Sequence, residues 1–191
     1  MPHSPHPTST PGAAADALRR LTRVVPDFPQ PGIVFEDLTP VLADPDAFAQ
    51  VVADITAFCR SFDADLIGGL DARGFLLGSA VALELGLGIL AIRKGGKLPP
   101  PVHRVEYDLE YGSAALEIPA SGIPLEGKRI ILVDDVLATG GTLRASRELL
   151  ERAGAGVVAL AVVLEVQGLG GREHFADLPL YVAGSGGAEE Q

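Results

Sequence analysis

The chain has 191 residues, of which 47% are hydrophobic, and its formal net charge is −10 at pH 7. This acidic balance argues against a nucleic-acid-binding surface, because a phosphate backbone requires a basic footprint, and no apolar run is long enough to span a membrane. The single cysteine, Cys59, excludes an internal disulfide framework and fits a reducing, cytoplasmic compartment, while the length suits one domain with a sizeable core.

The N-terminal third predicts two helices separated by a proline-rich segment. Residues 1–12 are rich in Pro, Ser, Thr and His and are expected to form a disordered arm. Residues 13–24 have the period of a short helix, with Leu18, Leu21 and Val25 on one face. Prolines at positions 26, 29 and 31 then predict an extended surface segment over about residues 26–37. Helical periodicity returns over residues 45–62.

The remainder of the chain alternates between strands and helices. Short strands are predicted at residues 66–67 and 89–92 on either side of a helix over about 75–85, which is a β-α-β unit with parallel strands. Further strands are expected at 130–133, 157–164 and 180–182, a helix at 141–153, and a disordered tail at 184–191. The alternation predicts an α/β, doubly wound, mainly parallel sheet in a single domain over residues 13–183, with its ligand at the carboxyl ends of the strands.

Residues 94–101, KGGKLPPP, form the least core-like stretch inside this domain. The next segment, residues 104–118, alternates and turns near Tyr111 and Gly112, which predicts a hairpin. A plain solvent loop is one interpretation of the stretch. We favour a flexible lid hairpin over residues 94–118, because basic residues beside an anionic ligand can close over it.

Residues 133–142, VDDVLATGGT, bear most directly on function. An apolar strand leads to Asp134 and Asp135, and small residues then open a helix, so that backbone N–H groups, threonine hydroxyls and the positive helix end can surround a phosphate. Because no Lys follows the glycines, this is not a Walker loop. Ionised carboxylates suit vicinal hydroxyl donors or a divalent cation, and a phosphate beside a diol describes a ribose 5-phosphate. Solvated acids before a glycine-rich turn are the alternative. The residues of the proposed phosphate loop are Ala138, Thr139, Gly140, Gly141 and Thr142.

This string resembles the signature loop of the type I phosphoribosyltransferases, which bind 5-phosphoribosyl 1-pyrophosphate. Further strings narrow the resemblance to the adenine phosphoribosyltransferases over about residues 13–183: PDFPQPGIVFED at 26–37, GLDARGFLLG at 69–78, IRKGGKLP at 92–99, YDLEYGSAALEI at 107–118 and EVQGLGGRE at 165–173. The resemblance implies that adenine N9 attacks C1 of the donor, which gives AMP and pyrophosphate in purine salvage. It also implies Mg²⁺ held mainly by substrate and water, and a homodimer.

The resemblance also assigns roles around the phosphoribosyl donor. Arg73 is expected to clamp the diphosphate, although an arginine paired with Asp71 for structure alone is the alternative. A non-proline cis peptide is expected at Asp71–Ala72. The donor-binding set implied beside the loop is Asp71, Arg73, Arg93, Lys94, Lys97, Asp134 and Asp135. In dimeric relatives one of the cations at 93, 94 and 97 reaches across to the other subunit, and the sequence does not say which.

For the base, Glu110 matches the general acid/base of the family, although Glu106 and Asp108 are equally eligible on the residues alone. Backbone groups about Val34 and Glu36 are expected to read the adenine edge, which would reject 6-oxopurines. Phe35 and Val166 are expected to sandwich the ring, with ordinary core packing as the alternative. Glu36 stands where the family usually has Arg or Lys, and this reversal is neutral if the contact is made through the backbone.

Three other functions are less consistent with the sequence. A donor-sensing transcription regulator requires a DNA-binding extension and a basic face, whereas this chain has a pI near 4.8. The loop alone does not exclude a phosphoribosyltransferase for xanthine, hypoxanthine or orotate, but PDFPQPGIVFED and LEYG favour adenine. A degenerate structural partner is disfavoured because Asp134, Asp135, Arg73 and Glu110 occur together.

Overall fold

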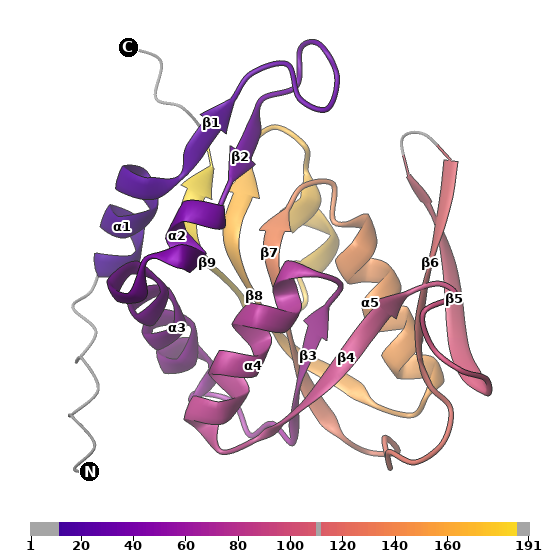
Figure 1. Cartoon of the computed structure of the whole chain (residues 1–191). Helices are drawn as coiled ribbons and strands as arrows, with labels where there is room; N and C mark the ends of the chain where they lie inside the picture. Colours follow the sequence, from indigo (N-terminus) through magenta and orange to yellow (C-terminus); the bar gives the residue numbers. More distant parts are fainter. Residues whose placement is uncertain (1–11, 110–111, 187–191) are drawn as a thin grey trace.

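The computed structural model describes residues 12–109 and 112–186. At its centre lies a seven-stranded sheet (Figure 1). Five neighbouring strands, β4, β3, β7, β8 and β9, run parallel, and the antiparallel hairpin β5–β6 extends the sheet beyond β4. The predicted α/β fold with a mainly parallel sheet is therefore confirmed. In spatial order the strands are β5 (Val102–Leu109), β6 (Gly112–Pro119), β4 (Gly88–Lys94), β3 (Leu66–Leu70), β7 (Arg129–Leu137), β8 (Gly156–Val166) and β9 (Leu180–Gly186).

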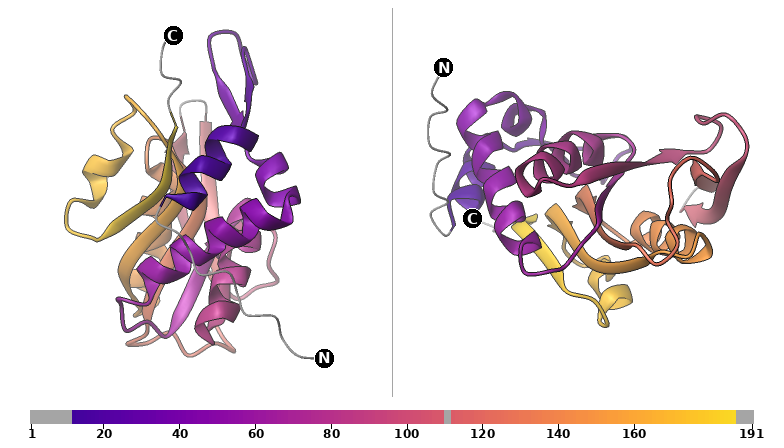
Figure 2. Two further views of the ribbon diagram at one scale, coloured as in Figure 1. Left: turned by 90° about the vertical axis from the view of Figure 1, so that its left-hand side faces the viewer. Right: turned by 90° about the horizontal axis from the view of Figure 1, so that it is seen from below.

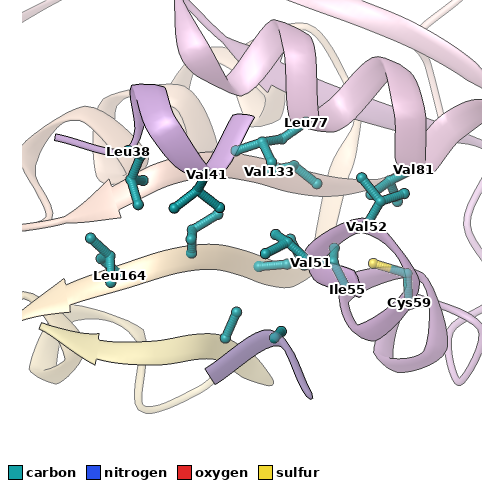
Figure 3. Packing of buried hydrophobic residues seen from close by; sticks show 14 of the residues in the cluster. Leu38, Val41, Val51, Val52, Ile55, Cys59, Leu77, Val81, Val133 and Leu164 are labelled. Carbon is teal, nitrogen blue, oxygen red and sulfur yellow. The ribbon is translucent and has the colours of Figure 1, made fainter. Parts of the chain in front are cut away.

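Helices cover both faces of this sheet (Figure 2). One face carries α1 (Ala13–Leu21), α2 (Thr39–Ala43), α3 (Pro45–Cys59) and α4 (Arg73–Leu85), and the other carries α5 (Gly141–Arg152) and the 3-10 helix η1 (Gly171–Phe175). Each layer closes over its own apolar core. The first core includes Leu38, Val51, Ile55, Leu77 and Val133 (Figure 3), and the second includes Leu132, Leu143, Leu149 and Leu160. Within the described residues, no helix has both the length and the apolar character that crossing a bilayer requires.

An antiparallel ribbon of β1 (Arg23–Val25) and β2 (Phe35–Asp37) projects beyond the sheet on the side to which the parallel strands point (Figure 1). We call residues 23–37 the hood. The expected helical position of Val25 was wrong, because α1 ends at Leu21 and Val25 pairs with Phe35. Arg23 holds the base of the ribbon by donating to Asp37 Oδ2 at 2.9 Å.

The parallel strands are longer than the sequence predicted, and the extensions of β7 and β9 change the most. β7 continues to Leu137, because Asp134 and the residues after it remain in register with β8, so the two carboxylates lie inside the strand rather than after it. β9 continues to Gly186, which pairs with Val166, although the tail was expected to begin at residue 184. Residues 1–11 of the expected arm and residues 187–191 of the expected tail lie outside the described residues.

Candidate active site

A pocket of about 1020 Å³ opens at the carboxyl ends of β3, β4 and β7, beside the β5–β6 hairpin. It collects many of the residues that the sequence singled out. Among its lining residues are the predicted Asp71, Arg73, Lys94, Asp134, Asp135, Ala138 and Thr142, together with Arg104, Tyr107, Ala114 and Ala115, which sequence reasoning missed. Of the described residues, Arg93, Lys97, Thr139, Gly140 and Gly141 are not in this lining, and Glu110 lies outside the described residues.

The phosphate loop joins β7 to α5. Its Gly140 is the residue before the helix and has φ 80°, a left-handed conformation that glycine adopts without steric cost. Helix η1 supports the loop from behind, since a β-carbon added at Gly140 would lie 3.0 Å from the Gly171 carbonyl oxygen and 3.2 Å from Phe175. The glycines of EVQGLGGRE therefore include one that the loop packs against. In the sequence, the glycines at 168, 170 and 171 were the feature that could have predicted this close contact.

Asp134 and Asp135 are both only 8% exposed. The Asp135 N–H donates to Asp134 Oδ1 at 2.9 Å. Burial, together with the neighbouring negative charge of Asp135, raises the pKa of Asp134 well above its ordinary value. A ligand that brings hydroxyl donors or positive charge to this carboxylate would favour its ionised form.

Arg73, the first residue of α4, forms an ion pair with Asp135 Oδ2. Its guanidinium carbon also lies 5.8 Å from the centroid of the Phe35 ring, which connects the hood to β7. The helix start can approach β7 because residue 74 is glycine: a β-carbon there would lie 2.7 Å from the Val133 carbonyl oxygen. Arg73 is thus placed between the carboxylate expected to bind ribose and the aromatic ring expected to contact the base.

The proposed alternative, a structural pair between Arg73 and Asp71, is not what forms. Asp71 Oδ2 instead accepts hydrogen bonds from Arg93 Nε at 3.1 Å and from the Lys94 N–H at 3.4 Å. Asp71 therefore orients the end of β4, where the basic segment begins. The peptide between Asp71 and Ala72 is cis, as predicted.

The turn at Gly95 and Gly96, where the segment expected to form a lid begins, is fixed to the β5–β6 hairpin by Glu117, a side chain that is 4% exposed. Glu117 accepts from Arg104 Nη1 at 2.6 Å and from the Gly96 N–H at 2.9 Å, and the Gly95 N–H donates to the Ala115 carbonyl at 2.8 Å. Although burial would raise it, the hydrogen bonds from Arg104 and Gly96 lower the pKa of Glu117 below its ordinary value. Arg104 and Glu117 are direct cross-strand partners. This pairing could have been predicted from the sequence, because the position of the hairpin turn near residue 111 fixes which residues of the two strands lie opposite each other.

The hood residues expected to bind adenine do not line the pocket. Val34 is 60% exposed, and Phe35 and Glu36 are half-buried. This partial burial raises the pKa of Glu36 above its ordinary value. Among residues 12–109 and 112–186, β2 is hydrogen-bonded to a strand on one side only, because β1 is its one partner in the sheet. Its other edge can therefore offer backbone donors and acceptors to a ligand. Val166 lines a different cavity of about 680 Å³ beside η1.

Comparison with known proteins gives a consistent result. The phosphoribosyl transferase domain family matches residues 42–176. The adenine phosphoribosyltransferase of Corynebacterium jeikeium is 71% identical over 91% of this chain and 84% of its own length. The crystal structure of the enzyme of that name from Thermoanaerobacter pseudethanolicus has a TM-score of 0.85 at 39% identity, covering 90% of this chain and 99% of that one. The Saccharomyces cerevisiae enzyme, solved with adenine and an imino-altritol bisphosphate, has a TM-score of 0.84 at 35% identity, with coverages of 90% and 98%.

Proposed function

Since the chain belongs to the phosphoribosyltransferase family, as one of its adenine phosphoribosyltransferases, we propose that the pocket at the carboxyl ends of β3, β4 and β7 is its active site. The enzyme converts adenine and 5-phosphoribosyl 1-pyrophosphate to AMP and pyrophosphate, a purine salvage reaction. One observation carries the assignment of the site: a buried pair of adjacent carboxylates, Asp134 and Asp135, lies two residues before a glycine loop at a helix N-terminus. That arrangement suits a ribose 5-phosphate.

The phosphate loop, residues 138–142, is proposed to bind the 5-phosphate of the donor. Backbone N–H groups at the start of α5 have no partner within the helix, and the helix dipole adds positive potential there. Thr142 lines the pocket, and Thr139 supplies a second hydroxyl in the same loop. The support from η1 keeps this anion site preformed, so little ordering is required when the phosphate binds.

Asp134 and Asp135 are proposed to accept hydrogen bonds from the ribose hydroxyls. Their negative charge would also favour the transition state, in which positive charge grows on the ring as the bond from C1 to the diphosphate breaks and the bond from N9 to C1 forms. Arg73 holds Asp135 in place and faces the pocket, from where its guanidinium can reach the departing diphosphate. Lys94 lines the same pocket, and Arg93 and Lys97 flank it in sequence.

Adenine is proposed to lie under the hood. The Arg73 contact places the Phe35 ring beside the pocket wall, and the unpaired edge of β2 can read the 6-amino group and N1 through the backbone of Val34 and Glu36. Val166 is proposed to cover the other side of the base. Glu110 is proposed to act as the general acid/base for the imidazole ring of adenine. Glu106, an alternative on sequence alone, instead pairs with Arg104 through its side chain.

Mg²⁺ is proposed as the cofactor, and it would supply positive charge to the diphosphate leaving group. Within the described residues, no group of three or more His, Cys, Asp or Glu side chains could hold a metal ion. The buried acid pair nevertheless lines the pocket and provides oxygen atoms of the kind that Mg²⁺ prefers as ligands. Asp134 and Asp135 therefore fit an ion that enters with the donor.

A homodimer in the cytoplasm is also proposed. Leu76 and Leu83 lie seven residues apart on α4 and are 56% and 81% exposed, and Ile89 of the neighbouring β4 is 38% exposed. Because residues at this spacing share a helix face, they form an apolar strip that a second subunit can cover. The strip adjoins the strand that carries Arg93 and Lys94, so a partner there would lie close to the pocket. A cytoplasmic location is inferred from the single cysteine.

The site assignment is tested by calorimetric titration of the donor with Mg²⁺ into the wild-type enzyme and into an Asp134→Asn/Asp135→Asn double variant. We expect tight binding by the wild type and a loss of about a hundredfold or more in the variant, because two charge-assisted contacts disappear. Equal donor affinity in the two proteins would show that the acid pair does not bind the ribose of the donor. Circular dichroism of the variant confirms that it is folded.

A further inference from the structure

Arg104 is a cation in the pocket for which the proposed mechanism has no use. It lies on β5, directly opposite Glu117 of β6, and it lines the same pocket as Arg73 and Lys94. The turn at Gly95 and Gly96 fits closely over it: a β-carbon added at Gly95 would lie 2.8 Å from Arg104 Nη1. One side of the guanidinium therefore packs against the Gly95 turn, while the side chain as a whole remains 45% exposed.

The two carboxylate partners of Arg104 are unlike. Glu117 is 5% exposed at its side chain and accepts from Nη1 at 2.6 Å, whereas Glu106 is 71% exposed and accepts from Nη2 at 3.2 Å and from Nε at 3.4 Å. Separating this pair would leave the buried carboxylate of Glu117 without its charged partner, so the contact with Glu117 is expected to persist when ligand binds. An exposed pair contributes little to stability, so the contact with Glu106 is readily exchanged.

We propose that Arg104 is a donor-binding residue that exchanges Glu106 for the diphosphate of 5-phosphoribosyl 1-pyrophosphate. Nε and Nη2, the two nitrogens now held by Glu106, form the planar edge of a guanidinium that matches a pair of phosphate oxygens. Nη1 continues to donate to Glu117, which also accepts from the Gly96 N–H. The bound diphosphate is therefore linked, through Arg104 and one buried carboxylate, to the turn at Gly95 and Gly96. Glu106 then acts as an internal competitor that occupies the arginine when the pocket is empty.

This inference rests on the proposed active site, and its test separates the two. The simple variant Arg104→Ala would leave the buried Glu117 charge unpaired and could fail to fold. The comparison is therefore made in a Glu117→Gln background, whose side chain can still accept from the Gly96 N–H but carries no charge. Glu117→Gln and Arg104→Met/Glu117→Gln differ only in the arginine. Arg129→Ala, at the opposite end of β7, is the control for removing a surface arginine.

Inorganic pyrophosphate with Mg²⁺ and, separately, AMP are titrated into each protein by calorimetry, and steady-state KM values are measured for the donor and for adenine. We expect loss of Arg104 to weaken pyrophosphate binding and raise the donor KM by about tenfold to a hundredfold, the contribution of one charge-assisted hydrogen bond or pair of bonds. AMP affinity and the adenine KM should be unchanged, since neither ligand carries the diphosphate. Glu106→Ala should lower the donor KM by up to about fivefold, because it removes the competitor.

Equal pyrophosphate affinity in the two Glu117→Gln proteins would overturn the proposal and leave Arg104 as a structural partner of Glu117. An unchanged or higher donor KM in Glu106→Ala would contradict the exchange. If the wild type itself formed no AMP from adenine, the failure would lie in the proposed function, whereas wild-type turnover with no effect of Arg104 would refute this inference alone.

Discussion

Gly171 of η1 packs directly against the carbonyl oxygen of Ala138, the first residue of the phosphate loop. A β-carbon added at Gly171 would overlap that oxygen and would lie 2.9 Å from Leu137 Cδ1, a distance that real β-carbons essentially never show. The short helix and the phosphate loop are thus held as one unit. Gly171, which does not line the pocket, therefore positions the loop that is proposed to bind the substrate phosphate.

Gly171→Ala is therefore expected to raise the donor KM by about tenfold or more and to destabilise the enzyme, because the loop or η1 must move. Gly156→Ala is the matched control, since its added β-carbon would meet no atom within 4 Å. Steady-state kinetics and thermal denaturation of both variants check the prediction. Equal behaviour of the two variants would show that the contact does not position the loop.

Asp134→Asn is expected to make the enzyme more stable but less active. Burial raises the pKa of Asp134 above its ordinary 3.8, so its ionisation opposes folding. The contribution of Asp134 to the free energy of unfolding is therefore fully present below pH 3.8, where the carboxyl group is neutral in both states. It is lost as pH rises through the higher pKa of the folded state. At neutral pH we expect Tm to rise by about 2–4 °C for each kcal/mol recovered, and kcat/KM to fall about tenfold or more.

The pH dependence provides the control for this prediction. The gain in Tm should grow as pH rises above about 4 and vanish at lower pH. Asp65→Asn should behave in the opposite way, because hydrogen bonds from the Arg129 N–H and from Lys128 lower the pKa of Asp65. A Tm for Asp134→Asn that falls at every pH would contradict the assigned cost of burying this carboxylate.

Glu36→Arg should leave the Michaelis constant for adenine within about twofold of the wild-type value. Glu36 lies opposite Val24 in the ribbon, and adenine is proposed to contact the backbone on the other edge of β2. Phe35→Ala should raise this constant, because the ring is proposed to cover the base. A change of tenfold or more in Glu36→Arg would assign a role in base binding to the reversed side chain.

Leu83→Glu should convert a dimer into a monomer, as measured by light scattering coupled to size-exclusion chromatography. The side chain is 81% exposed, so the charge should leave the subunit fold intact while opposing burial of the apolar strip. Ile123→Glu, at a residue 38% exposed outside the strip, is the control and should keep the wild-type mass. Dimers that persist in Leu83→Glu would place the subunit contact on another surface.

Most of the sheet could be predicted because its strands are apolar runs between glycine-rich and helical segments, as residues 157–164 illustrate. The ribbon was not predicted as paired strands, since Arg23–Val25 and Phe35–Asp37 are too short to show alternation and are joined by a proline-rich turn. The extension of β7 through the acid pair was missed for a different reason. Adjacent carboxylates usually indicate a strand end, because burying them costs desolvation free energy, whereas here both lie inside β7 at the proposed ribose site.

The candidate site shows the same division. The phosphate loop and acid pair are contiguous in sequence, so their chemistry could be inferred from residue types alone. The pairing of Arg73 with Asp135 and of Arg104 with Glu117 depends on which elements are neighbours and on strand register. Local sequence carries little of that information, and for this reason Arg73 was assigned Asp71 as its alternative partner and Arg104 was overlooked.

The most direct test of the account is a steady-state assay of the purified enzyme with 5-phosphoribosyl 1-pyrophosphate and Mg²⁺, with adenine, hypoxanthine, guanine and xanthine offered in parallel. The account predicts AMP formation from adenine with kcat/KM at least about a thousandfold above that of any 6-oxopurine, since those bases would leave the hood backbone groups that they cover unpaired. It also predicts that a chelator abolishes turnover and that added Mg²⁺ restores it. Preferential turnover of a 6-oxopurine, or unchanged activity in chelator, would contradict it.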